Sequence, residues 1–389
     1  MSSNRVAVVG TGQTKYASTR GDVSLAGLLR EAVFRALEDA HMTMADIDAI
    51  VVGKAPDFFE GVMIPEYALA DAIGAVGKPL LRVHTAGSVG GSTAIVAANH
   101  IESGVARRVL TVAWEMQSCS EAMWALSFQI PFQQQLVAGA GGYFAPYIRN
   151  YIARSGAPDD IGIQVAVKDR LNALRNPYAH LHEPEITYDS VRESLMLWDP
   201  IRYSETCPSS DGAFAMVLGD EATADAAAAE GRQPAWIQGM ALRSEPAMAA
   251  GRDQVNPQAG RDCVADVYAQ AGITNPIEEI DAVECYVPFS WYEPMWMENL
   301  GFAEVGEGWK LTESGATGPD GKLPVNCSGG VLSSNPIGAS GMIRFGEATM
   351  QVRGMAGDHQ VDGVRRALGH AYGGATQFFA MWVVGTDKP

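Results

Sequence analysis

The sequence between residues 326 and 341 contains the strongest candidate for a chemical site. It reads NCSGGVLSSNPIGASG, so glycine-rich turns run into small residues that should open a helix. A turn of this kind directs backbone N–H groups and the positive end of a helix dipole toward one point. Such a point suits the negative oxygen that develops when a carbonyl group reacts. The pattern therefore predicts an oxyanion-stabilising site close to Asn335.

The elements that must position this loop alternate along the chain. Apolar runs typical of strands occur at residues 5–10, 47–52, 108–113, 235–239, 280–285 and 378–385. Residues 24–40 have helical spacing, and a second glycine turn at 86–91 leads into a helical stretch at 92–103. This alternation predicts an α/β fold built in layers. Both halves of the chain show it, although the sequence identity between them is too low to establish an internal repeat.

Composition and charge restrict the class of protein. The chain has 389 residues, 47% hydrophobic and 19% charged, which indicates a globular enzyme with one or two cores. Its formal charge of -17 disfavours binding to nucleic acid and to anionic membranes. Five cysteines without metal-ligand spacing argue against a zinc site and against a disulfide framework. No signal peptide and no membrane span are expected. We therefore expect a cytoplasmic protein without a metal site.

The loop at 326–341 closely resembles the N-x-S-G-G … G-H-P-x-G-A-S/T-G loop of the thiolase superfamily, in particular that of the sterol-carrier-protein-type thiolases. Further stretches in the family's order are 11–14, 210–213, 298–302 and 369–374, so the resemblance covers nearly the whole chain. It implies a thiolase-like fold of two similar αβαβα halves, with central helices packed between two sheets and both glycine turns at one active site. We place the halves at 1–233, with a surface or lid excursion at about 115–205, and at 234–389.

The sequence departs from the thiolase pattern at each catalytic position. Gly87 stands where the family has its nucleophilic cysteine, and Tyr286 stands where it has the histidine of an H-D-C-F motif. The cysteine of that motif is replaced by Pro288, and Asn335 replaces the histidine that activates the nucleophile. Tyr372 lies at, or within one residue of, another acid/base position. The resemblance therefore implies a thiolase-like site without thiolase chemistry.

This departure resembles the thiolase-like steroid side-chain retro-aldolases, which use tyrosines on CoA thioesters together with a small zinc-ribbon and OB-fold partner. By that resemblance Tyr286 and Tyr372 form the base and acid pair, in either assignment, and Asn335 orients a carbonyl group or a water. The resemblance also implies CoA as part of the substrate, no covalently bound cofactor, a homodimer and an α2β2 complex. Gly87 and Gly374 would offer backbone donors.

Lowering a phenol's pKa requires positive charge nearby. His370 and the helix after Asn335 are the candidates for that role. Among the remaining histidines, His84 is expected to be structural, since no metal-ligand spacing surrounds it.

Other interpretations remain open. Ser88 is either a helix cap, which we favour, or a nucleophile. An acyl-CoA acyltransferase that uses Ser88 or a cysteine shifted from the usual position is the first alternative function. A non-catalytic scaffold or lipid carrier is the second. The apolar segments at 114–116 and 128–136 could form the surface of a dimer, although core packing explains them equally well.

Overall fold

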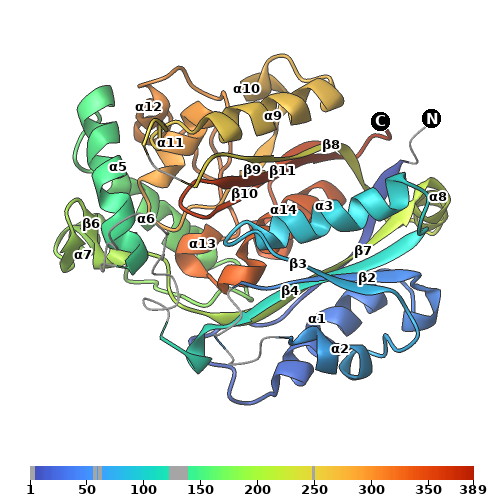
Figure 1. The fold of residues 1–389 in the computed structure, drawn as a ribbon. Coiled ribbons are helices and arrows are strands. Elements are labelled where there is room, and N and C mark those ends of the chain that lie inside the picture. The colour runs from blue at the N-terminus through green and yellow to red at the C-terminus, as the bar shows by residue number, and fades with distance from the viewer. Residues whose placement is uncertain (1–4, 56–58, 60–63, 122–138, 248–249) are drawn as a thin grey trace.

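The computed structural model describes residues 5–55, 59, 64–121, 139–247 and 250–389 (Figure 1). In this part of the chain one mixed sheet of nine strands has the order β3-β2-β4-β7-β1-β8-β11-β10-β9. Its strands are β1 (Val6–Gln13), β2 (Ala49–Gly53), β3 (Leu80–Val83), β4 (Arg108–Met116), β7 (Asp211–Asp220), β8 (Ala235–Ser244), β9 (Ala282–Glu284), β10 (Arg366–Gly373) and β11 (Phe378–Gly385). A separate ribbon consists of β5 (Met196–Trp198) and β6 (Ile201–Arg202).

Helices lie between and outside the two halves of this sheet. They are α1 (Leu25–Asp39), α2 (Glu66–Ala72), α3 (Val89–Glu102), α5 (Gly139–Ser155), α6 (Ile161–Ala173), α7 (Tyr188–Arg192), α8 (Glu221–Ala229), α9 (Gln258–Ala271), α10 (Pro276–Glu279), α11 (Tyr292–Asn299), α12 (Gly308–Glu313), α13 (Gly330–Ser333) and α14 (Ile337–Arg353). Short 3-10 turns occur at η1 (Met44–Asp46), η2 (Gln117–Cys119), η3 (Tyr203–Glu205) and η4 (Gly357–His359).

The layers follow the expected αβαβα order. Helices α3 and α14 lie between the halves of the sheet, α1 and α2 cover one outer face, and α9 and α10 cover the other (Figure 1). The halves also repeat their topology, since β2-β4-β7-β1 and β9-β10-β11-β8 both pair parallel, antiparallel and antiparallel. The α/β thiolase-like fold with two similar halves is therefore confirmed.

The sheet is continuous where the resemblance implied two separate sheets. Strands β1 and β8 are the inner edges of the two halves, and they pair antiparallel through Ala7 with Trp236 and Val8 with Ala235. An edge strand carries unpaired backbone groups, and pairing the two edges satisfies some of them. The domain division at residue 234 stays a prediction.

Local sequence signals fixed the first helix closely. Helix α1 begins after Ser24, whose hydroxyl accepts the Gly27 N–H at 3.1 Å. Its buried side chains follow the spacing that the sequence shows, namely Leu28, Leu29, Ala32, Val33, Ala36 and Leu37. The second expected helix, 92–103, begins three residues earlier, at Val89, because Gly90 and Gly91 already belong to its first turn.

The proposed dimer surface at 114–116 belongs to the core instead. Trp114 is fully buried within the chain and Met116 is 8% exposed, since both lie on the inner strand β4. The other proposed segment, 128–136, lies outside the described residues. None of the helices in the described part of the chain has the length and hydrophobicity that a membrane crossing requires.

Residues 176–200, which belong to the predicted surface or lid excursion at about 115–205, pack against the chain beside the second glycine loop. The His180 N–H donates to Ser334 Oγ at 2.9 Å, and the Leu181 N–H donates to the Ser333 carbonyl at 3.0 Å. This segment contributes no side chain to the main pocket among the described residues, whereas α5 contributes two. The lid role of the longer range 115–205 stays a prediction.

Candidate active site

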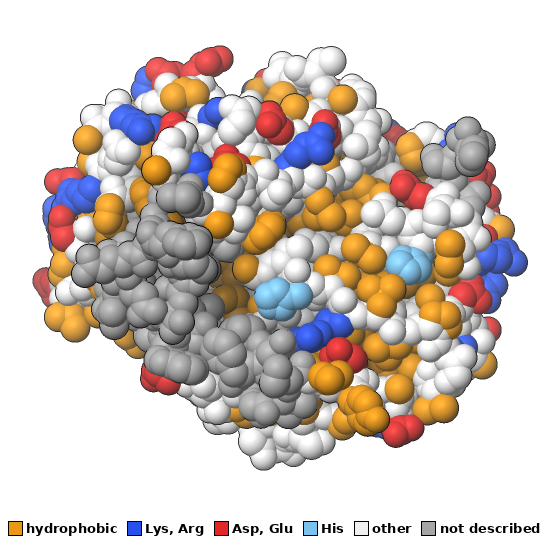
Figure 2. All heavy atoms as spheres, in the orientation of Figure 1, with side chains coloured by type: hydrophobic (Ala, Val, Ile, Leu, Met, Phe, Trp, Pro, Cys, Tyr) orange, Lys and Arg blue, Asp and Glu red, His pale blue; other side chains and the backbone are white. Residues whose placement is uncertain are grey.

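A pocket of about 280 Å³ opens where the ends of α3, α14, β10 and the segment after β9 meet. Figure 2 shows hydrophobic side chains across the centre of this face of the molecule, with a hollow among them. The pocket is lined by Ala55, His84, Ala86, Gly87, Ala140, Phe144, Cys207, Tyr286, Pro288, Phe289, Asn335, Ile337, Tyr372, Gly373, Gly374 and Ala375. Most of these side chains are apolar, so an apolar ligand that carries a few polar atoms fits best.

Two glycines bring the central helices into backbone contact beside the pocket. A Cβ atom on Gly90 of α3 would lie 2.3 Å from the backbone nitrogen of Met342 in α14. A Cβ atom on Gly341 would likewise lie 2.9 Å from the backbone nitrogen of Gly91. Because no side chain separates the helices here, both N-termini can approach the same pocket. The sequence signal that predicted two meeting glycine turns therefore has a direct structural reason.

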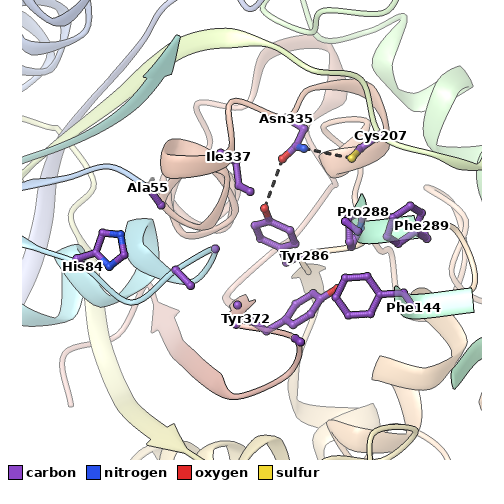
Figure 3. Close-up of a pocket in the computed structure, with 16 residues that line it drawn as sticks. Ala55, His84, Phe144, Cys207, Tyr286, Pro288, Phe289, Asn335, Ile337 and Tyr372 are labelled. Carbon is purple, nitrogen blue, oxygen red and sulfur yellow. Dashed lines mark hydrogen bonds between the residues drawn. The ribbon is translucent and has the colours of Figure 1, made fainter. Parts of the chain in front are cut away.

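Both predicted tyrosines line the pocket. Tyr286 follows β9 and Tyr372 lies near the end of β10, and their ring centroids are 5.4 Å apart with nearly perpendicular planes, at 82° (Figure 3). Trp296 of α11 holds the pair from behind, since its Nε1 donates to the Tyr286 carbonyl at 2.8 Å and its ring lies 4.8 Å from that of Tyr372. The structure therefore brings together two residues that are 86 positions apart in the sequence.

The Tyr286 hydroxyl lies close to Gly87, the residue that the sequence predicts at the position of the thiolase nucleophile. A Cβ atom built on Gly87 would lie 3.8 Å from that hydroxyl and 3.2 Å from the Tyr372 carbonyl oxygen. The phenol thus stands beside the turn in which a thiolase has its nucleophile. Gly374, with a φ of 62°, also lines the pocket, just past β10. The role of Gly87 and Gly374 as backbone donors stays a prediction.

Both phenols are protonated at neutral pH in this environment. Burial raises the pKa of Tyr286 and the pKa of Tyr372 well above the usual value of a tyrosine. The residue Tyr372 is 3% exposed, and its hydroxyl has no hydrogen-bond partner in the described structure. A buried hydroxyl without a partner is energetically costly, which indicates that a bound ligand supplies one.

His370 does not supply the positive charge that the sequence suggested. It is fully buried, and desolvation lowers its pKa to about 3, so the ring is neutral. Its Nδ1 accepts the Tyr286 N–H at 3.3 Å, which assigns the proton to Nε2. The ring lies 6.1 Å from that of Tyr372 and contributes nothing to the pocket wall. His370 therefore positions the backbone of Tyr286 and is not a charged neighbour.

Asn335 lies between two pocket side chains, Tyr286 and Cys207, as Figure 3 shows. Its Oδ1 accepts from the Tyr286 hydroxyl at 3.4 Å and from the Ser340 hydroxyl at 2.7 Å, and its Nδ2 donates to Cys207 Sγ at 3.1 Å. Its backbone N–H donates to Ser210 Oγ at 3.0 Å. The amide is therefore fixed in one orientation, with its oxygen toward the phenol and its nitrogen toward the thiol.

The sequence reasoning missed Cys207. This cysteine lines the pocket, and burial raises the pKa of its thiol to about 11, although the Arg170 charge and the Asn335 amide act in the opposite direction. The thiol is therefore protonated at neutral pH. The signal that could have found it is its position, three residues before the family-like stretch at 210–213. Cys285 and Cys327, which flank the site in sequence, are buried and lie outside the pocket.

Ser88 fits neither of the roles weighed for it. It occupies the N-cap position of α3, but its hydroxyl donates to the Thr85 carbonyl at 2.7 Å and makes no capping hydrogen bond. The cap interpretation was therefore wrong about the contact, because Ser88 has helical backbone angles that turn its hydroxyl back toward Thr85. Ser88 is also fully buried and does not line the pocket, which leaves it without access to a substrate.

His84 is exposed and lines the edge of the pocket (Figure 3). Its expected structural role stays a prediction. Within the described ranges, no three His, Cys, Asp or Glu side chains converge in a way that could hold a metal ion.

Only the second half of the loop at 326–341 reaches the pocket. In the first half, Asn326 Oδ1 accepts the Cys285 N–H at 2.9 Å, and the Ser328 hydroxyl donates to Glu284 Oε2 at 2.9 Å. Arg344 of α14 completes this support by pairing with Glu284 in the buried interior. The asparagine and serine of the motif thus hold the loop in place, and Asn335 and Ile337 face the ligand space.

The five-layer fold and the paired helix N-termini define a thiolase-like α/β protein. A family description, thiolase C-terminal domain-like, matches residues 242–386. The acetyl-CoA acetyltransferase of Methanothermobacter thermautotrophicus is 31% identical over 386 residues, which cover 95% of this chain and 96% of that protein. The chain therefore belongs to the thiolase superfamily, and within it to the SCP2-thiolase-like proteins.

Two further similarities refine this placement. Human sterol carrier protein 2 is 27% identical over 391 residues, which cover 95% of this chain and 70% of that protein. Among solved structures, the Ltp2-ChsH2(DUF35) aldolase has a TM-score of 0.85 and 26% identity, and the match covers all of this chain and 99% of the other. The similar proteins thus include both a named acyltransferase and a named aldolase.

Proposed function

We propose that this protein cleaves a carbon–carbon bond of a β-hydroxyacyl-CoA thioester by a retro-aldol reaction. The observation that carries this proposal is the meeting of two phenols beside Gly87, where a thiolase has its nucleophilic sulfur. The similarity to an Ltp2-ChsH2(DUF35) aldolase supports the same class of reaction. Steroid side-chain-like acyl groups are the proposed substrates, because the pocket is mainly apolar.

In this reaction one tyrosine, as phenolate, accepts the proton of the β-hydroxyl group. The Cα–Cβ bond then breaks, the β-carbon leaves as a carbonyl compound, and the electron pair forms a thioester enolate. Backbone N–H groups at the two helix turns stabilise the enolate oxygen. The second tyrosine protonates Cα, and a shortened acyl-CoA results. Asn335 fixes the hydroxyl of Tyr286, and either tyrosine can take either role.

The raised pKa values affect how this chemistry runs. The reactive form carries one phenolate, and burial makes that form a minor population at neutral pH. The other phenol must keep its proton, which burial favours. Burial therefore favours the protonated phenol that acts as the acid. It also limits the rate, because only a small fraction of the molecules carries the phenolate that acts as the base.

Replacing both tyrosines tests the proposal. Tyr286→Phe and Tyr372→Phe should each lower the release of the carbonyl product by at least about a hundredfold, as expected for loss of general acid–base catalysis. Tyr67→Phe is the matched control, because Tyr67 is 87% exposed on α2. Binding of a saturated acyl-CoA should be retained in all three variants. Unchanged turnover in both pocket variants would refute the proposal.

An acyltransferase is the second candidate, and the pocket thiol of Cys207 favours it. The name of the archaeal relative points the same way. Against it stands Gly87, the residue that the sequence predicts at the usual nucleophile position. Transfer of labelled acetyl from acetyl-CoA to the protein, lost on treatment with hydroxylamine, would establish this activity.

We further propose a homodimer that binds a small zinc-ribbon and OB-fold subunit, because the similar aldolase structure contains ChsH2(DUF35). Assays should therefore compare the chain alone with the chain coexpressed with a subunit of that class. The absence of turnover under both conditions, with acyl-CoA still bound, would favour the non-catalytic scaffold or lipid carrier.

A further inference from the structure

We propose that Cys207 is a covalent binding site for α,β-unsaturated acyl thioesters, which form when a β-hydroxyacyl thioester loses water. The choice of an acyl thioester rests on the proposed function. All five cysteines lie in the described residues, and Cys207 is the one that lines the pocket. Cys263, Cys285 and Cys327 are buried elsewhere, and Cys119 is exposed outside the pocket.

The position of the thiol is fixed from two sides. The Cys207 N–H donates to the Pro288 carbonyl at 2.9 Å, which ties this segment to the residues after Tyr286. On the other side Asn335 Nδ2 donates to the sulfur at 3.1 Å. The same amide accepts from the Tyr286 hydroxyl through its oxygen. The thiol and this phenol therefore flank one side chain and face one ligand space (Figure 3).

An independent observation indicates that a ligand with a polar atom occupies this space. Tyr372 lines the pocket and is almost fully buried, and its hydroxyl has no hydrogen-bond partner in the described part of the chain. A thioester carbonyl oxygen in the pocket would accept this hydrogen bond. The acyl carbons next to that carbonyl would then lie in the space that the Cys207 sulfur shares.

The chemistry of the addition matches the enolate chemistry proposed for the pocket. The Cys207 sulfur forms a bond to Cβ, the carbon–carbon double bond becomes single, and its electron pair moves to Cα and the thioester oxygen. This enolate is the same kind of intermediate as in the retro-aldol step, so the same donors stabilise it. The thiol proton is finally delivered to Cα. The product is a thioether that still carries CoA, and no oxidant or further reactant is needed.

The test uses the full chain, with crotonyl-CoA as the probe and its saturated analogue butyryl-CoA as the control. Intact mass spectrometry should show the added mass of one whole crotonyl-CoA, mapped to Cys207. Hydroxylamine should cleave the CoA thioester of this adduct and leave the four-carbon acyl group attached to Cys207 through the thioether. Butyryl-CoA should add nothing covalently, but it should slow the alkylation of Cys207 by iodoacetamide at least about fivefold. Cys207→Ser should abolish the adduct, and Cys119→Ser should retain it.

Each contrary outcome identifies what fails. No adduct at crotonyl-CoA concentrations that saturate binding, or an adduct on Cys119 alone, overturns the assignment. A hydroxylamine-sensitive adduct without CoA also overturns it and supports acyl transfer instead. If Cys207→Ser does not fold, iodoacetamide protection on the unmodified chain still decides, because lack of protection overturns the site. Retro-aldol turnover without an adduct refutes this inference alone, whereas an adduct without turnover refutes only the proposed lyase activity.

Discussion

The turns before α3 and before α14 occupy equivalent places in the two halves but contribute differently to the pocket. The first turn presents Gly87, which has no side chain, and it keeps the Ser88 hydroxyl inside the turn. The second turn presents Asn335, whose amide contacts Tyr286, Ser340 and Cys207. One half therefore supplies bare backbone at the site, and the other supplies the side chains that orient reactive groups.

Under the proposed function, the fold keeps a helix-dipole site while the reaction changes. The dipole and the backbone N–H groups of a helix do not depend on which side chains the turn carries. The contact between Gly90 and the backbone of Met342 preserves their arrangement. Under the proposed function, Tyr286 and Tyr372 at the adjoining strand ends take over proton transfer while this arrangement of the helices stays the same.

The largest expected effect comes from pH. Because burial raises the pKa of both phenols, the phenolate fraction should increase about tenfold for each pH unit above 7. The rate of carbonyl release at low substrate concentration should therefore rise about a hundredfold from pH 7 to pH 9. Circular dichroism at each pH is the control for folding. A rate that is flat over this range would show that the base is another group.

The contact between α3 and α14 should be the part of the fold whose substitution destabilises the protein most. Gly90→Ala places a methyl group 2.3 Å from the Met342 nitrogen, and it should lower the free energy of unfolding by about 1–3 kcal/mol or more. Urea unfolding measures the change. Gly27→Ala in α1 is the matched control, because the nearest atom to its new methyl group is at 3.3 Å and alanine favours a helix. Equal stability of the two variants would contradict this account.

The Asn335 side chain in the second turn should affect the rate of the reaction. Asn335→Ala removes the acceptor of the Tyr286 hydroxyl and should lower kcat about tenfold, which corresponds to the loss of one hydrogen bond. Ser340→Ala leaves that acceptor in place, so its effect should be smaller. Steady-state kinetics on both variants decide the matter. A larger loss in Ser340→Ala would show that Asn335 does not position the phenol.

The first turn should tolerate change best. Gly87→Ala brings a methyl group to 3.2 Å from the Tyr372 carbonyl and 3.4 Å from the Gly373 Cα, so the neighbours need move only slightly. The free energy of unfolding should change by less than about 1 kcal/mol, with a few-fold loss of turnover as space beside Tyr286 is filled. A destabilisation as large as that of Gly90→Ala would contradict the difference that we expect between the helix contact at Gly90 and the pocket at Gly87.

Much of the fold and part of the site could be predicted from the sequence. Helix α1 has its cap and its apolar spacing within one segment, so its start at Leu25 is a local property. The family-like order of motifs placed Tyr286, Tyr372 and Asn335 at one pocket before any distance was known. The sequence reasoning missed that Cys207 joins them, since the contact of Cys207 with Asn335 spans 128 positions.

The sequence by itself determined helix α1, the six strands predicted from apolar runs and the two glycine turns, because these depend on residues near one another in the chain. Only the tertiary structure decided the protonation of His370, the partner of the Ser88 hydroxyl and the pairing of β1 with β8. Each of these depends on desolvation or on the approach of distant segments. Such effects arise when the chain is packed, and no local pattern of residue types contains them.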